Sequence, residues 1–91
     1  MEKIEIRQNV SREELEKMGV FSWGVWSKEV SEFPWSYDEK ETCYILEGEA
    51  AIVSGDGKQE TIRKGDLVVF DSGLQCTWKI TKPIKKHFKF G

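Results

Sequence analysis

Turn-forming glycines divide most of the chain into short apolar runs, and no other feature constrains the fold as strongly. Turn signals stand at residues 47–48, 55–57, 64–66 and 72–73. Between these turns, β-branched and aromatic residues dominate, as in residues 41–46 and 67–70. Short strands separated by turns every 8 to 12 residues or so are typical of a β-sandwich or barrel. The pattern therefore predicts an all-β domain from residue 21 onward.

The same pattern places the individual strands. We expect strands over residues 3–7, 21–28, 29–37, 41–46, 50–54, 59–62, 67–70, 76–80 and 84–90. Gly55-Asp56-Gly57 predicts a hairpin, with Asp56 as a turn residue. Pro34 cannot donate to a neighbouring strand, so its segment is expected to be an edge strand, a bulge or a loop entry. Residues 67–70 are wholly apolar, which indicates a strand buried on both faces.

One short helix is expected near the N-terminus. Ser11 and Glu14 have the spacing of a capping box, with Ser11 as the N-cap. The helix runs through Met18, and Gly19 closes it. With 91 residues the chain is expected to form a single domain, with a strand and helix in residues 1–20 and a barrel in residues 21–91.

Composition excludes several classes of function. The 14 basic and 16 acidic residues nearly balance, which argues against a nucleic-acid-binding face. One basic cluster occurs near the C-terminus, and we expect it to be a solvated face of a strand pair: Lys79, Lys82, Lys85, Lys86 and Lys89. No apolar run approaches the ~20 residues of a membrane span, and the charged N-terminus lacks a signal-peptide core, so we expect a cytoplasmic protein. Abundant Lys and Glu with few Asn and Gln fit a thermophilic source.

A carboxylate and a thiol are predicted to point into the barrel. Residues two apart in a strand share a face, so Glu41 and Cys43 face the same side as Ile45. If Ile45 is in the core, both polar groups enter it as well. A buried carboxylate needs a partner or a raised pKa, so this position predicts either a site or an internal hydrogen-bond network.

The spacing of two segments resembles the two conserved motifs of the cupin superfamily. Glu41 and Gly48 correspond to the glutamate and glycine of the first motif, and Gly65, Gly73 and Cys76 to the glycines and histidine of the second. The stretches 33–35, 41–49, 64–70 and 73–78 are similar to short single-domain cupins grouped with the cupin domain of (S)-ureidoglycine aminohydrolase. The resemblance covers roughly residues 20 to 91 and implies a double-stranded β-helix, or jelly-roll barrel.

The metal ligands of the family are mostly replaced. The resemblance implies a His-x-His pair within residues 34–37, where this chain has no histidine, and Cys76 takes the place of the third histidine. Glu41 and Cys76 are then the remaining candidates for a divalent metal, with Cys43 and Tyr37 as additional ligands. The only histidine, His87, is expected to be structural, at the surface or partly buried. We therefore expect no firmly bound cofactor.

The leading functional interpretation is a barrel that binds a small polar or aromatic metabolite. Six residues are expected to line its pocket: Trp35, Tyr37, Glu41, Cys43, Cys76 and Trp78. Two alternatives stay open, namely a metal-dependent aminohydrolase or isomerase with a Glu/Cys ligand set, and a structural subunit with a vestigial pocket. The cysteines are expected to be free thiols. They could be nucleophiles, a redox pair, soft-metal ligands or small buried hydrophobes, since a reactive thiol requires a cationic neighbour. A homodimer is expected, with Trp26 as one residue that a partner subunit could cover.

Overall fold

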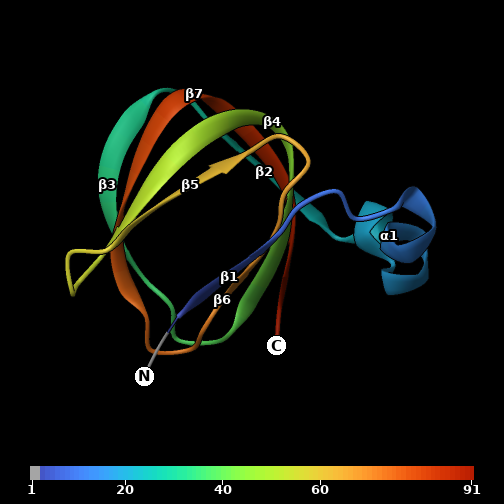
Figure 1. The fold of residues 1–91 in the computed structure, drawn as a ribbon, viewed down its shortest axis with the longest axis horizontal. Coiled ribbons are helices and arrows are strands. Elements are labelled where there is room, and N and C mark those ends of the chain that lie inside the picture. The colour runs from blue at the N-terminus through green and yellow to red at the C-terminus, as the bar shows by residue number, and fades with distance from the viewer. Residues whose placement is uncertain (1–2) are drawn as a thin grey trace.

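The predicted all-β architecture with one short helix is confirmed. The computed structural model describes residues 3–91. Its elements in chain order are β1 (Ile4–Arg7), α1 (Arg12–Met18), the 3-10 helix η1 (Val20–Ser22), β2 (Gly24–Lys28), β3 (Ser31–Ser36), β4 (Glu41–Ser54), β5 (Gln59–Arg63), β6 (Leu67–Phe70) and β7 (Gln75–Phe90). Figure 1 shows the strands curving around a common interior, with α1 projecting at one side.

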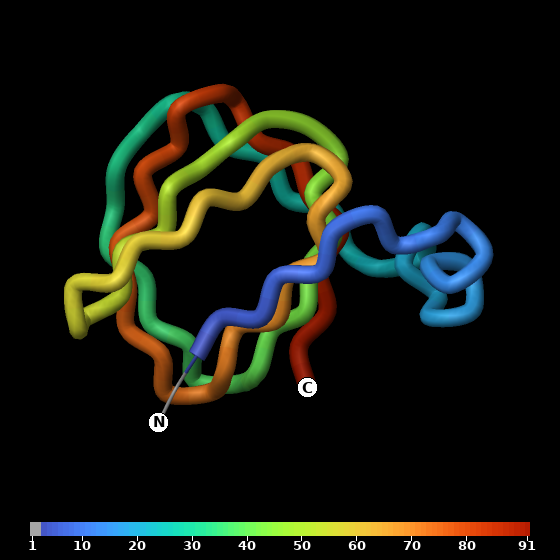
Figure 2. The backbone as a smooth tube through the Cα atoms, in the orientation of Figure 1, coloured from blue at the N-terminus to red at the C-terminus, as the bar shows by residue number. Residues whose placement is uncertain are grey.

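Two long strands, β4 and β7, organise the barrel. They pair antiparallel over nearly their whole length, from Glu41 opposite Phe90 to Ser54 opposite Cys76. The first part of β4 also pairs with β6, which pairs with β1, while its second part pairs with β5. On its other edge β7 pairs first with β3 and then with β2. The strands curve around a common interior, as the tube in Figure 2 shows.

The continuity of β4 and β7 corrects the sequence analysis. The predicted turn at residues 47–48 and the predicted break between residues 80 and 84 are both wrong, because each long strand continues through a bend. The register shifts between Ile45 and Ala50 mark bulges at this bend. Gly48 has φ 92°, and a Cβ atom there would collide with the carbonyl oxygen of Pro83 on the facing strand. Gly48 therefore allows two bent strands to cross closely instead of ending one of them.

The N-terminal helix forms as predicted. The Ser11 side chain accepts a hydrogen bond from the Glu14 backbone N–H at 3.2 Å, and Gly19 caps the C-terminus in the left-handed conformation. The predicted strand 21–28 begins three residues late, at Gly24, because η1 occupies Val20–Ser22. Leu15 and Val20 pack on Leu67 in a small apolar cluster. This cluster attaches the helical segment to the outside of the barrel.

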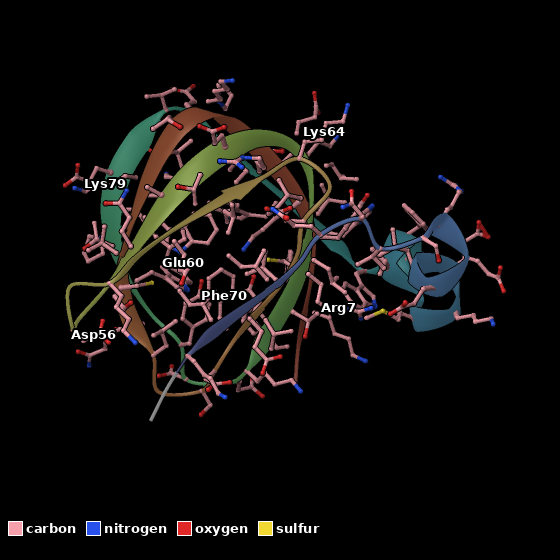
Figure 3. The ribbon with its side chains drawn as sticks, in the orientation of Figure 1. Arg7, Asp56, Glu60, Lys64, Phe70 and Lys79 are labelled. Atoms are coloured by element: carbon pink, nitrogen blue, oxygen red, sulfur yellow. The ribbon has the colours of Figure 1, made fainter. Side chains whose placement is uncertain are left out.

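The barrel interior is filled by alternate residues of the long strands. Glu41, Cys43 and Ile45 are all buried, so their predicted inward orientation is confirmed. Ile52, Ile62 and other aliphatic residues fill the same core. Figure 3 shows Phe70 within the ring of strands and Asp56 at the tip of the β4–β5 hairpin. The predicted edge position of the Pro34 segment is confirmed, since β3 pairs only with β7 over residues 3–91. None of the helices in this part of the chain is long and apolar enough to cross a membrane.

Candidate ligand-binding site

An aromatic cavity opens between β2, β3, β4 and β7. Its volume is about 200 Å³, and its wall consists of Trp26, Phe33, Trp35, Tyr37, Glu41, Trp78, Lys86, Phe88 and Phe90. A protein cavity of about 150 Å³ is large enough for benzene. The space therefore suits a molecule of one ring with a small substituent.

The aromatic side chains brace one another. Trp78 stacks on Phe33 with ring centroids 6.2 Å apart and meets Trp26 edge-on at 5.9 Å. Tyr37 stacks on the buried Phe70 at 4.7 Å. Trp35 and Phe90 are about half exposed and form the accessible part of the wall. This arrangement offers flat apolar surfaces that are already held in place.

A glycine makes room for one wall of the cavity. Gly24 on β2 lies opposite Phe88 on β7, and a Cβ atom at residue 24 would lie 2.9 Å from the Phe88 ring. Any side chain at this position would displace that ring. Gly24 thus has a steric role beside the site, which its sequence context did not reveal.

Glu41 and Lys86 form a buried ion pair in this wall. Lys86 Nζ lies 2.6 Å from Glu41 Oε2, and the two side chains are only 7% and 4% exposed. Lys86 is opposite Ile45 in the register, so its side chain extends along the inner face toward the start of β4. A buried charge is costly unless it is paired. Each of these two groups supplies the partner that the other needs.

Two tryptophans enclose the ammonium group of Lys86. Its Nζ lies 5.0 Å from the Trp26 ring centroid and 4.9 Å from that of Trp78, distances typical of cation–π contacts. The predicted solvated lysine cluster is therefore wrong at Lys86. The missed signal was the strand alternation itself, because Ile84 and Phe88 flank Lys86 on the same face. Trp26 likewise faces the cavity, so cover by a partner subunit is not required there, and the homodimer stays a prediction.

One oxygen of Glu41 has no hydrogen-bond partner among residues 3–91. Oε2 accepts the hydrogen bond from Lys86, whereas Oε1 has no donor within hydrogen-bonding distance among residues 3–91. In the same range, the only fully buried side-chain nitrogen or oxygen atom without a partner is His87 Nδ1. Oε1 is thus not completely enclosed, and because Glu41 belongs to the cavity wall, this oxygen is a candidate acceptor for a molecule bound there.

Tyr37 adds a neutral hydroxyl group to the same wall. Its oxygen accepts a hydrogen bond from Trp78 Nε1 at 3.1 Å. Burial raises the pKa of Tyr37, and the nearby Glu41 carboxylate raises it further, while the hydrogen bond from Trp78 acts in the opposite direction. The phenol therefore keeps its proton, which it can donate to a ligand.

The two cysteines lie in the core beside the cavity rather than on its wall. Both are buried free thiols. The other predicted site residues do contribute to the wall, namely Trp35, Tyr37, Glu41 and Trp78. Burial raises the pKa of Cys43 to about 12 and that of Cys76 to about 11. Lys86 is the cationic neighbour that the local sequence did not show, and it lowers both pKa values by less than burial raises them. The thiols accordingly have the surroundings of small buried hydrophobes.

The residues of this site do not fit the divalent metal that the resemblance to cupins implies. Within residues 3–91, no group of three or more His, Cys, Asp and Glu side chains is placed to hold a metal ion. The Glu41 carboxylate already faces a cation, the Lys86 ammonium group. His87 lies between two inward-facing residues of β7 and packs edge-on against Phe21 at 5.9 Å, away from the cavity wall. Neither the thiols nor His87 completes a ligand set with Glu41.

A β-barrel of this topology with a polar group in its interior is typical of the cupin class of proteins. Residues 15–88 match the EutQ-like cupin domain. The chain belongs to this family. No curated protein matches it with significant similarity.

Solved structures agree with this assignment. A DUF861 family protein from Thermotoga maritima is 46% identical, with a TM-score of 0.95 over 98% of this chain and 100% of that one. The EutQ protein of Clostridium difficile is 15% identical, with a TM-score of 0.68 over 98% of this chain and 68% of its own. A putative ethanolamine utilization protein Q from Salmonella typhimurium has a TM-score of 0.67 at 19% identity, over 96% of this chain and 68% of its own. The last two similarities concern the fold alone.

Proposed function

We propose that this protein binds a small molecule in the aromatic cavity. The observation that carries the proposal is an open space of about 200 Å³ whose apolar wall includes a buried carboxylate with one free oxygen. A few placed polar groups among apolar and aromatic side chains are the usual composition of a small-molecule site. A vestigial barrel would be expected to fill this space with its own side chains.

A metal-dependent aminohydrolase or isomerase receives less support. Such a reaction would need Glu41 as a ligand, and Glu41 is engaged by Lys86 at 2.6 Å. Metal analysis of protein purified without chelator tests this alternative. Stoichiometric manganese, iron, zinc or nickel would support a metal-dependent enzyme.

A ligand screen tests the binding proposal. Sugars, nucleobases and ureides are screened by thermal shift and confirmed by calorimetry, with ureides included because of the motif resemblance to the ureidoglycine aminohydrolase cupin domain. A ligand at 100 times its Kd should stabilise the fold by about 2.7 kcal/mol. The proposal fails if no compound binds, or if every hit binds Glu41→Gln as tightly as wild type.

A matched control separates the site from general effects of charge removal. Glu49 lies on the same strand as Glu41 and pairs with Arg63 at 3.7 Å on the surface, away from the cavity. Glu49→Gln should therefore retain all binding.

A further inference from the structure

The charges of the cavity restrict the kind of molecule that it accepts. Lys86 and Glu41 neutralise each other, so the site carries no net charge from this pair. A cationic ligand would approach the ammonium of Lys86, and an anionic ligand would approach the carboxylate of Glu41. Beside a mostly apolar wall, either approach is penalised. The electrostatics consequently favour a neutral molecule.

Lys86 is poorly placed to bind an anion. One side of its ammonium group faces Glu41 Oε2, and the rings of Trp26 and Trp78 cover two further directions. An anionic ligand would have to displace Glu41 from a buried 2.6 Å contact. Lys86 thus engages Glu41 Oε2 and leaves Oε1 as the acceptor.

The remaining polar atoms form a complementary pair. Glu41 Oε1 can accept a hydrogen bond, and the Tyr37 hydroxyl group can donate one while its oxygen accepts from Trp78. Both residues belong to the cavity wall. A carboxamide or lactam carries an N–H donor next to a carbonyl acceptor, which matches this pair without adding charge.

We infer that the cavity binds a neutral, planar, one-ring molecule with an amide-type group, whose N–H donates to Glu41 Oε1 and whose carbonyl accepts from the Tyr37 hydroxyl. The ring lies against the aromatic walls formed by Trp26, Phe33 and Trp78. This inference rests on the proposed function and specifies the ligand class of the same cavity.

Four compounds of similar size and different polar groups test the inference with wild-type protein. Benzamide has the donor and the acceptor, acetophenone has only the carbonyl, benzoate is an anion and benzamidine is a cation at pH 7. Binding is followed by calorimetry and by the fluorescence of the tryptophans, three of which lie in the wall. Benzamide should bind most tightly, with acetophenone about 10- to 100-fold weaker because it lacks the donor to a charged acceptor. Benzoate and benzamidinium should be weaker than benzamide by at least about 10-fold.

Two variants separate the roles of the polar groups. Tyr37→Phe should weaken benzamide and acetophenone alike, because both present a carbonyl. Glu41→Gln should weaken benzamide far more than acetophenone. If Glu41→Gln does not fold, Glu41→Gln/Lys86→Met replaces it, and the ratio of the two affinities should fall to less than about 10. Glu49→Gln should leave the ratio unchanged.

The outcomes distinguish this inference from the proposed function. Tightest binding of benzoate or benzamidinium would overturn the inferred class while leaving a binding cavity in place. Equal binding of benzamide and acetophenone would overturn the role of Glu41 Oε1. If none of the four binds while the broader screen gives hits that require Glu41, the inference fails and the proposed function stands. If neither experiment gives a hit, both fail.

Discussion

Two ion pairs in this molecule have the same length and opposite surroundings. Lys86 and Glu41 meet at 2.6 Å inside the barrel, with side chains 7% and 4% exposed. Arg7 of β1 and Glu14 of α1 also meet at 2.6 Å, but their side chains are 52% and 43% exposed. Distance alone therefore says little about what a pair contributes. The consequence of losing one partner depends on whether water can solvate the other.

The two pairs also differ in how far each charged group depends on its partner. Water can replace either partner of the surface pair, so that pair only supports the contact between β1 and α1. Inside the barrel, Glu41 has Lys86 as its partner, and Lys86 is surrounded by Glu41 and two indole rings. Neither group of the buried pair can be lost without leaving the other unpartnered, and in the proposed function the second oxygen of Glu41 accepts a hydrogen bond from the ligand.

The largest expected effect follows from breaking the buried pair on one side. Glu41→Gln and Lys86→Met should each lower the free energy of unfolding by about 3–5 kcal/mol, because the remaining group is left buried without its partner. Urea denaturation measures the change, with Glu49→Gln as a control on the same strand. If the free energy of unfolding fell by less than about 1 kcal/mol, the remaining charge would have to be solvated by water, and the pair would not behave as a buried one.

Replacing both partners should restore much of that loss. Glu41→Gln/Lys86→Met removes both charges, and buried pairs exchanged for neutral groups of similar size are often as stable as the original. We expect the double variant to be more stable than either single variant by roughly 1–4 kcal/mol. In the matched surface cycle, the changes in unfolding free energy caused by Arg7→Gln and Glu14→Gln should nearly add up in the double variant. If the changes caused by Glu41→Gln and Lys86→Met also added up, the contrast between the two pairs would be contradicted.

The parts of the fold that depend on local chemistry could be predicted from the sequence. Ser11 and Gly19 define the helix ends because capping involves residues close in the chain. The inward orientation of Glu41 followed from its alternation with Ile45. Gly48 misled the prediction, since a glycine favours a turn locally but here it lies against Pro83 at the bend of two continuous strands.

Lys86 shows why half of the site could not be predicted. Its type suggested solvent, although Ile84 and Phe88 on either side placed it on the inner face by the argument used for Glu41. Its pairing with Glu41 depends on how β4 and β7 align, which no local pattern fixes. Trp26 and Phe88 were missed for the same reason, because each lines the cavity only through the register of β2 with β7.

The raised pKa values of the two thiols predict slow alkylation and a loss of stability at high pH. Burial raises the pKa of Cys76 to about 11, so at pH 8 only about one thiol in a thousand is ionised, and iodoacetamide should alkylate native protein slowly. Both thiols have raised pKa values in the fold, so their contribution to stability is complete below about pH 9 and is lost as the pH rises toward 11 and 12. Urea titrations from pH 8 to 11 should show this decline, and Cys43→Ala/Cys76→Ala should show less of it.

Removing Glu41 should affect the two thiols differently. The carboxylate raises the pKa of Cys43, whereas it is not among the causes that shift Cys76. In Glu41→Gln, the pKa of Cys43 should therefore fall, because the carboxylate that raises it is gone, while the pKa of Cys76 should change less. Mass spectrometry of peptides alkylated under native conditions assigns the reaction to each cysteine. Equal acceleration at both sites would indicate general loosening of the barrel instead of a change in charge.

The smallest expected effect concerns the surface pair. The hydrogen bond from Arg7 holds the pKa of Glu14 below its usual value of 4.5. A carboxyl group with a lowered pKa in the fold stabilises it above its ordinary pKa, and that contribution is lost as the pH falls through the lowered value. NMR titration of Glu14 should show this depressed pKa in wild type and an ordinary one in Arg7→Gln. In 1 M NaCl, where charges are screened over about 3 Å, the difference in the Glu14 pKa between wild type and Arg7→Gln should shrink.

A control variant is available on the same helix. Lys17→Gln breaks the pair between Lys17 and Glu13 and should leave the pKa of Glu14 unchanged. A salt-resistant shift at Glu14 would mean that this pair is shielded from water, and the contrast with the barrel interior would then lose its basis.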